Sequence, residues 1–187
     1  GGHMIADAES SLQRLRAESQ ALADDCGSQK SDEVFVGIGN CLCRLQLAAI
    51  EGTGIRLTTV NQFFVNTARS RRGDLAGFEQ KLGVLRACCQ AGSLPHSPAD
   101  LDAFVLTYRA QGYPTISHSA VYRDQYKPAY RVVDSAYRDY FALFCRIDAL
   151  LESQDTVCVT IDSPSDPGKS TLSALLGQVY DCNLWRP

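Results

Sequence analysis

Apolar residues recur every three or four positions through most of the first 111 residues, which is the spacing of one face of an α-helix. The stretch Glu33–Glu51 is apolar almost all round, as expected of a central, buried helix. Short connections between the periodic stretches predict a helical bundle. Five helices are predicted: Met4–Asp24, Glu33–Glu51, one opened by Thr58 or Thr59, one capped by Asp74 and ended by Gly92, and one running from Ser97 to Gly112.

The first predicted helix carries a narrow apolar stripe between Met4 and Asp24. Such a stripe can dock on the body of the protein or pair with a second copy of the chain. At roughly 20 residues the helix is short for an independent coiled coil, and Ser19 interrupts the seam. Docking is therefore the favoured interpretation.

Residues 112–131 break the helical pattern and are rich in tyrosine, with Arg123, Lys127 and Arg131 between the rings. Aromatic rings beside cations can stack on bases or on other planar ligands. Tyrosines also pack half-buried linkers, with the ring inside and the hydroxyl in water. Packing is favoured, with Tyr113 and Tyr130 as the expected anchors.

The last third of the chain changes from a helical pattern to a strand pattern. A long amphipathic helix is predicted over Ala129–Glu152, and the Val/Ile-rich run Thr156–Ile161 predicts a buried strand. A tight loop over Asp162–Thr171 and a helix that starts in Leu172–Leu176 follow, and Tyr180–Trp185 is the candidate for a second strand.

The expected fold class is therefore mainly α, with a bundle of five to six helices followed by a single C-terminal βαβ unit. Residues 1–3 resemble a remnant of cloning and are set aside. The remaining chain is divided into a helical domain over 4–111, a tyrosine-rich connector and long helix over 112–152, and an incomplete βαβ unit over 153–187.

Composition excludes some classes of protein. The 187-residue chain has a formal net charge of −3, which gives no general reason to expect nucleic acid or an anionic membrane as partner. No apolar run approaches the roughly 20 residues of a membrane span, so a cytoplasmic protein is expected. Arg69, Arg71 and Arg72 form a basic cluster that could hold a phosphate, but such a run more often faces water at a helix C-terminus.

Eight cysteines raise the question of a metal site. Cys41-x-Cys43 and Cys88-Cys89 do not match the usual spacing of zinc ligands, and no histidine pair accompanies them. We therefore expect free thiols that behave mainly as small buried hydrophobic side chains.

Candidate chemistry lies between the predicted strand and the helix after it. Gly168-Lys169-Ser170-Thr171 is the end of a phosphate-binding loop, G-x-x-x-x-G-K-[ST]. Backbone N–H groups from Ser165 onward and the start of the helix would converge on an anion. Lys169 would contribute a positive charge, and the hydroxyl of Ser170 would bind Mg²⁺ when a nucleotide is present.

Three residues depart from the loop pattern. Ser163 stands where the leading glycine is expected, Asp166 adds a negative charge, and Pro167 removes one backbone N–H donor. Each change weakens the attraction of the loop for phosphate.

From about Gly112 onward the chain resembles the amino-terminal portion of uridine kinase-like P-loop proteins, whereas residues 4–111 resemble no family. The resemblance implies binding of ATP or GTP with Mg²⁺, with Lys169 at the outer phosphates and Ser170 at the metal. It rests on Gly112-Tyr-Pro114, His118-Ser119, Tyr122-Arg123, Tyr126-x-Pro128-Ala-Tyr-Arg-Val-Val133, Val159-x-Ile161-Asp162, Gly168–Leu172 and Tyr180–Asn183.

Members of that family carry their general base, metal-binding acid and lid beyond the counterpart of Asn183. The expected function is thus that of a truncated or degenerate kinase-like protein that binds a nucleotide weakly without transferring a phosphoryl group. The alternative is a non-enzymatic helical domain that binds a protein partner or a second copy of itself.

Overall fold

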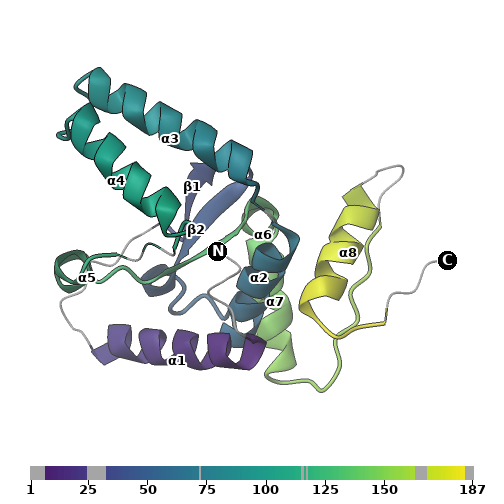
Figure 1. The fold of residues 1–187 in the computed structure, drawn as a ribbon. Helices are drawn as coiled ribbons and strands as arrows, with labels where there is room; N and C mark the ends of the chain where they lie inside the picture. Colours follow the sequence, from purple (N-terminus) through teal and green to yellow (C-terminus); the bar gives the residue numbers. More distant parts are fainter. Residues whose placement is uncertain are drawn as a thin grey trace. The chain divides into compact units, whose positions relative to one another are not determined.

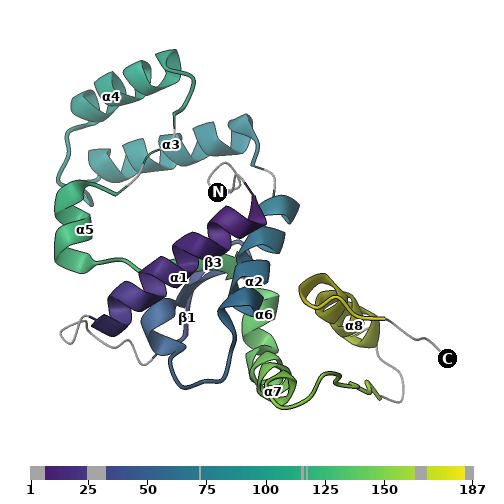
Figure 2. The ribbon, with the colours of Figure 1, turned by 90° about the horizontal axis from the view of Figure 1, so that it is seen from below.

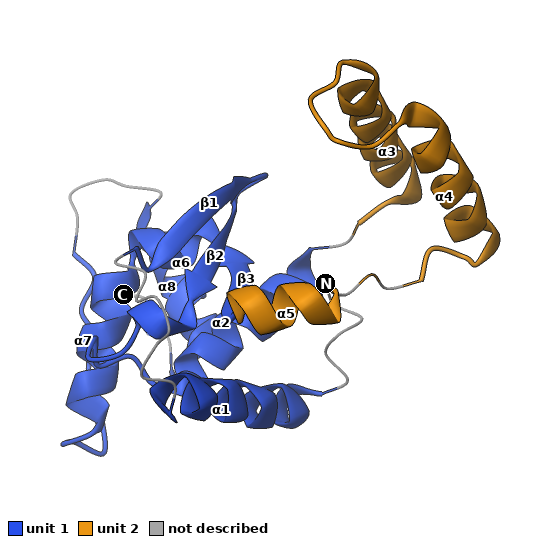
Figure 3. Ribbon diagram, turned by 90° about the vertical axis from the view of Figure 1, so that its left-hand side faces the viewer, with its two compact units in different colours: residues 1–71, 128–187 blue, residues 72–127 orange. Residues whose placement is uncertain are grey.

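The computed structural model describes residues 7–24, 33–71, 73–114, 116, 118–162 and 168–183. They fall into two compact units: unit 1 comprises residues 1–71 and 128–187, and unit 2 comprises residues 72–127 (Figure 3). The units divide the chain at residues 71 and 127, whereas the sequence prediction divided it at residues 111 and 152. Unit 1 therefore joins two segments that are far apart in sequence.

An antiparallel three-stranded sheet lies in unit 1, with the order β1 (Phe35–Gly39), β2 (Leu42–Gln46), β3 (Tyr130–Asp134) (Figure 1). The central strand β2 pairs Leu45 with Phe35 on one side and with Arg131 on the other. Strand β3 arrives from nearly 90 residues further along the chain, so local sequence pattern alone does not specify this pairing.

Helices complete unit 1, and α2 is their centre: it contacts α1, β3 and α8. In Figure 2, α1 runs across the sheet beside α2. The helices of this unit are α1 (Ala8–Asp24), the 3₁₀ turn η2 (Leu47–Ala49), α2 (Leu57–Ser70), α6 (Ser135–Asp139), α7 (Phe141–Leu151) and α8 (Gly168–Val179).

The core of unit 1 is built around Phe63, which is fully buried on α2. Its ring stacks on Tyr137 at 4.2 Å between centroids and meets Phe144 edge to face at 4.7 Å. Leu15 of α1 and Val133 of β3 are also fully buried in this cluster. The apolar stripe of α1 therefore docks on the body of its own unit, as the sequence predicted.

Unit 2 contains a helical hairpin of α3 (Leu75–Gln90) and α4 (Pro98–Ala110), followed by the short helix α5 (Ala120–Tyr126). Both hairpin helices begin at the predicted caps. The Asp74 side chain accepts a hydrogen bond from the backbone N–H of Gly77, and Ser97 accepts one from Asp100. These caps satisfy N–H groups that the first turn of a helix leaves without a partner.

The predicted fold class is wrong. Neither a bundle of five to six helices nor a parallel βαβ unit is present in the described residues, which form eight α-helices and one small antiparallel sheet. The largest error is Glu33–Glu51, predicted as a central helix and found as the β1–β2 hairpin followed by η2. The predicted helix Ala129–Glu152 is instead β3, α6 and α7, with Tyr140 between the two helices.

Candidate phosphate-binding site

Helix α8 begins within the motif that predicted the phosphate loop. Gly168 is its first residue, and Lys169, Ser170 and Thr171 complete its first turn. Ser170 and Thr171 are exposed, and Lys169 is half-buried. Lys169 and the first N–H groups of α8 therefore belong to the same end of the helix. Ser165, the other predicted contact, lies outside the described residues.

The opposite face of α8 fixes the helix on unit 1. Leu176 and Val179 are buried, and Leu172 and Leu175 pack against the same core. These positions recur every three or four residues, so they form one face. The side-chain amide of Asn66 also donates a 2.8 Å hydrogen bond to the carbonyl of Gln178. Helix α8 is thus held along its length and not only at one end.

Tyr180, directly after α8, reaches the most buried charged group among the described residues. Its hydroxyl donates a 2.9 Å hydrogen bond to Asp148, whose side chain is 0% exposed. Asp148 also accepts hydrogen bonds from the backbone N–H of Arg56 at 2.8 Å, from Arg56 Nε at 3.1 Å and from the hydroxyl of Thr59 at 3.0 Å. The carboxylate therefore joins α7, the start of α2 and the end of α8.

The pKa of Tyr180 is raised because burial and the nearby negative charge of Asp148 both disfavour ionisation of the phenol. The hydroxyl therefore stays protonated and continues to donate to Asp148 at physiological pH. Sequence analysis did not single out Asp148. An isolated acid in the apolar helix Phe141–Leu151 was the available signal, since buried charges are rare unless they are paired.

The predicted strand before the motif is not formed. Residues Thr156–Asp162 belong to no strand, and their backbone makes no hydrogen bond to any described residue. Ile161 packs against the core, whereas Val159 is exposed. A run with strand propensity still needs a neighbouring strand to complete its hydrogen bonds, and the described residues supply none here. The described part of the second predicted strand, residues 180–183, likewise contains no strand.

The described residues contain no group of three His, Cys, Asp or Glu side chains that could hold a metal ion. Ser170, the predicted ligand of Mg²⁺, is exposed in the first turn of α8.

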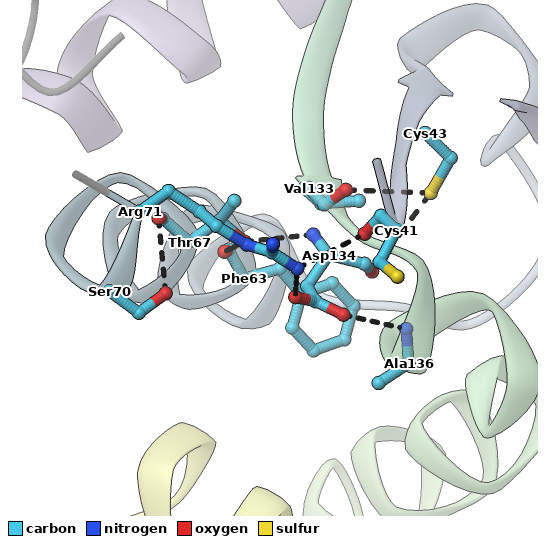
Figure 4. Close-up of polar contacts among 9 residues, drawn as sticks. All are labelled: Cys41, Cys43, Phe63, Thr67, Ser70, Arg71, Val133, Asp134 and Ala136. Atoms are coloured by element: carbon cyan, nitrogen blue, oxygen red, sulfur yellow. Dashed lines mark hydrogen bonds and ion pairs between the residues drawn. The ribbon is translucent and has the colours of Figure 1, made fainter. Parts of the chain in front are cut away.

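Within the basic cluster, Arg71 is paired with an acid of the same chain. Arg71 Nη2 lies 2.5 Å from Asp134 Oδ2 and also donates to the carbonyl of Cys41 (Figure 4). This partner raises the pKa of the Arg71 guanidinium further. The backbone N–H of Asp134 in turn donates to the hydroxyl of Thr67 at 2.9 Å. Arg71 therefore ties the end of α2 to the sheet, while Arg69 is exposed and Arg72 lies outside the described residues.

The tyrosine-rich segment divides into two environments. Tyr113 and Tyr130 are half-buried, as predicted: Tyr113 donates to Glu79, and the guanidinium of Arg44 lies 4.9 Å above the ring of Tyr130. Tyr122 and Tyr126 are exposed on α5. Packing therefore explains the positions of Tyr113 and Tyr130, but it does not explain the exposed rings of Tyr122 and Tyr126.

The seven cysteines among the described residues are free thiols. Cys43 and Cys89 are buried, whereas Cys41, Cys158 and Cys182 are exposed. The expected burial is therefore found at Cys43 and Cys89, whereas the exposed thiols do not behave as buried hydrophobic side chains.

Among the described residues, no helix has both the length and the apolar character needed to cross a membrane. Comparisons of the chain with protein-family models, with curated proteins and with solved structures gave no match.

Proposed function

We propose that this chain binds the phosphates of ATP or GTP, together with Mg²⁺, at the N-terminal end of α8. One observation carries the proposal: α8 begins at Gly168, so the residues Gly168–Thr171 form the first turn of a helix, where the phosphate-loop motif requires them. The positive end of the helix dipole at that turn and the charge of Lys169 both favour an anion.

The proposal concerns binding and not phosphoryl transfer. In a complete phosphate loop a buried strand fixes one end of the loop and a helix fixes the other. Here the helix is anchored by Leu176, Val179 and Tyr180, but Thr156–Asp162 forms no ladder with the described residues. Since Thr156–Asp162 forms no strand, and Ser163, Asp166 and Pro167 depart from the motif, we expect weak affinity.

Isothermal titration calorimetry with Mg·ATP tests this proposal. We expect saturable binding that Lys169→Ala weakens at least about tenfold, because a charge-assisted contact to phosphate is lost. Lys81→Ala is the matched control, since Lys81 is exposed on α3 in unit 2. The absence of heat with millimolar nucleotide, or equal binding by the Lys169→Ala protein, would contradict the proposal.

The α3–α4 hairpin favours a second candidate function, which is binding of a protein partner or a second copy. The ion pairs Arg86–Asp102 and Arg109–Glu79 join the two helices. At 100° per residue, all four charged residues fall on one side of the helix–helix contact, whereas Leu85 and Phe104 fall on the other. Leu85 is 38% exposed and Phe104 is 55% exposed. The hairpin thus presents an apolar side, which is a common feature of interaction surfaces.

A further inference from the structure

Strand β1 lies at an edge of the sheet, and its pairing with β2 fixes the direction of its backbone groups. The N–H of Gln46 donates to the carbonyl of Val34 at 2.9 Å, so this pair is hydrogen-bonded. Hydrogen-bonded and non-hydrogen-bonded pairs alternate along an antiparallel ladder. The N–H and C=O groups of Phe35 and Gly37 therefore point away from β2, toward the outer side of the sheet.

The opposite edge of the sheet is covered by a helix. There the N–H of Asp134 in β3 points away from β2 and donates to the hydroxyl of Thr67 in α2 at 2.9 Å. At the β1 edge, no described residue makes a hydrogen bond to the outward groups of Phe35 or Gly37. Of the two edges, β1 is thus the one whose outward hydrogen bonds are not made within the described chain.

The residues of β1 leave this edge open to a partner. Gly37 is exposed, and a Cβ atom placed on it would meet no atom within 4 Å beyond its chain neighbours. Ile38 is 42% exposed. Phe35 is buried, and its ring meets Phe141 edge to face at 5.0 Å between centroids. Since a buried backbone group without a hydrogen bond is costly, the outward groups of Phe35 favour a partner strand.

The edge is complementary to itself. Strand Phe35–Gly39 contains no charged residue and no proline, which commonly prevent two edges from pairing. If two copies pair antiparallel about Val36, Phe35 of each copy lies opposite Gly37 of the other. Both residues have outward groups, so each of these pairs exchanges an N–H and a C=O. An aromatic residue opposite an edge glycine is also a favourable cross-strand pair.

We propose that β1 pairs edge to edge with β1 of a second copy of this chain, antiparallel and about a two-fold axis at Val36. The bulge between Gly37 and Gly39 confines this pairing to the straight part of the strand. The interface lies in unit 1, so it differs from the apolar side of the α3–α4 hairpin. It also does not rest on phosphate binding at α8.

Disulfide crosslinking of the full chain tests the register. Opposite residues of a non-hydrogen-bonded pair lie about 4.5 Å apart between Cα atoms, which a disulfide spans. Val36→Cys should therefore give a covalent dimer in oxidised glutathione. Because the chain has native cysteines, mass spectrometry of the linked peptides identifies the bond at position 36. Ile38→Cys is the matched control, since this pairing separates the two copies of position 38 by about 14 Å along the strands.

Gly37→Pro tests the hydrogen bonds. Proline is tolerated on an edge strand where the N–H points outward, so the fold should persist and the circular dichroism spectrum should stay unchanged. Each dimer loses two hydrogen bonds, so we expect the dimer dissociation constant from light scattering to rise at least about tenfold.

Three results would overturn the proposal. The first is a monomer at every concentration, which would leave an extended segment of another protein as the occupant of the edge. The second is an equal yield of linked dimer from Val36→Cys and Ile38→Cys. The third is a dimer that Gly37→Pro does not weaken and Leu85→Glu does, which would place the contact on the α3–α4 hairpin.

Discussion

The hydroxyl of Tyr180 lies 2.9 Å from a carboxylate oxygen of Asp148, although 32 residues separate them in sequence. This hydrogen bond joins the residue after α8 to the middle of α7. It places a neutral donor against a fully buried charge that Arg56 also contacts. The candidate phosphate-binding helix is therefore anchored at its far end by a polar contact within the core.

Removing this hydroxyl should lower stability measurably. Tyr180→Phe takes one donor from the buried carboxylate, and hydrogen bonds to charged groups contribute about 1.5–3 kcal/mol. We expect a loss of that size in the free energy of unfolding measured with urea. Tyr126→Phe is the control, because its hydroxyl is exposed. Equal stability of the two variants would show that the Tyr180–Asp148 contact contributes nothing.

The turn between β1 and β2 predicts a stabilising substitution. Asn40 and Cys41 both have positive φ, 53° and 55°, which is the conformation of a two-residue hairpin turn that favours Asn-Gly. Cys41→Gly relieves the strain of a left-handed non-glycine residue, partly offset by the greater entropy of glycine in the unfolded chain. We expect a net gain of about 0.5–1 kcal/mol in urea unfolding. Cys41→Ala removes the thiol and keeps the strain, so a gain in that variant too would refute the explanation.

Unit 2 should lose stability in acid through Glu79. Arg109, and then Tyr113, lower the pKa of this carboxyl from 4.5 to about 2. Because the folded-state pKa is the lower one, the unfolded state binds more protons between these values, and stability falls as pH drops from about 4.5 to 2. Glu79→Gln should flatten this part of the profile of thermal midpoint against pH, measured by circular dichroism. Glu152→Gln, an exposed position in unit 1, should leave the profile unchanged.

The apolar side of the α3–α4 hairpin can be tested with two adjacent residues. Val84 is 64% exposed and points away from α4 by helical geometry, whereas Leu85 borders the hairpin contact. If this side binds a second copy, Leu85→Glu should shift the mass measured by light scattering toward the monomer, and Val84→Glu should not. A monomer at every concentration for the unsubstituted chain would leave self-association without support.

The starts of α3 and α4 were predicted correctly because each N-cap depends on only a few neighbouring residues. Asp74 and Ser97 accept the hydrogen bonds that their positions implied. Glu33–Glu51 forms a hairpin and not a helix because its apolar residues alternate along β2, and high apolar content alone does not distinguish a buried helix from a strand. Cys43, Leu45 and Leu47 are buried at alternate positions, and Gly39 with Asn40 marked a turn. That alternation was visible in the sequence.

Other features could not be predicted from local pattern. The pairing of β2 with β3 joins Leu45 to Arg131, and only the tertiary fold brings them together. The same limit applies to Thr156–Asp162, whose composition indicates a strand although no described neighbour pairs with it. For the candidate site, the sequence predicted a helix directly after the motif, whereas α8 already includes Gly168–Thr171, and the contact between Tyr180 and Asp148 required the structure.

The most direct test of phosphate binding at α8 is a titration of the full chain with Mg·ATP, followed through the backbone amide signals of Gly168, Lys169, Ser170 and Thr171 by NMR. Binding at the first turn predicts saturable shifts of these four amides, strongly reduced by Lys169→Ala and absent with adenosine. Unchanged amide signals at Gly168–Thr171 with millimolar Mg·ATP would contradict the proposed function.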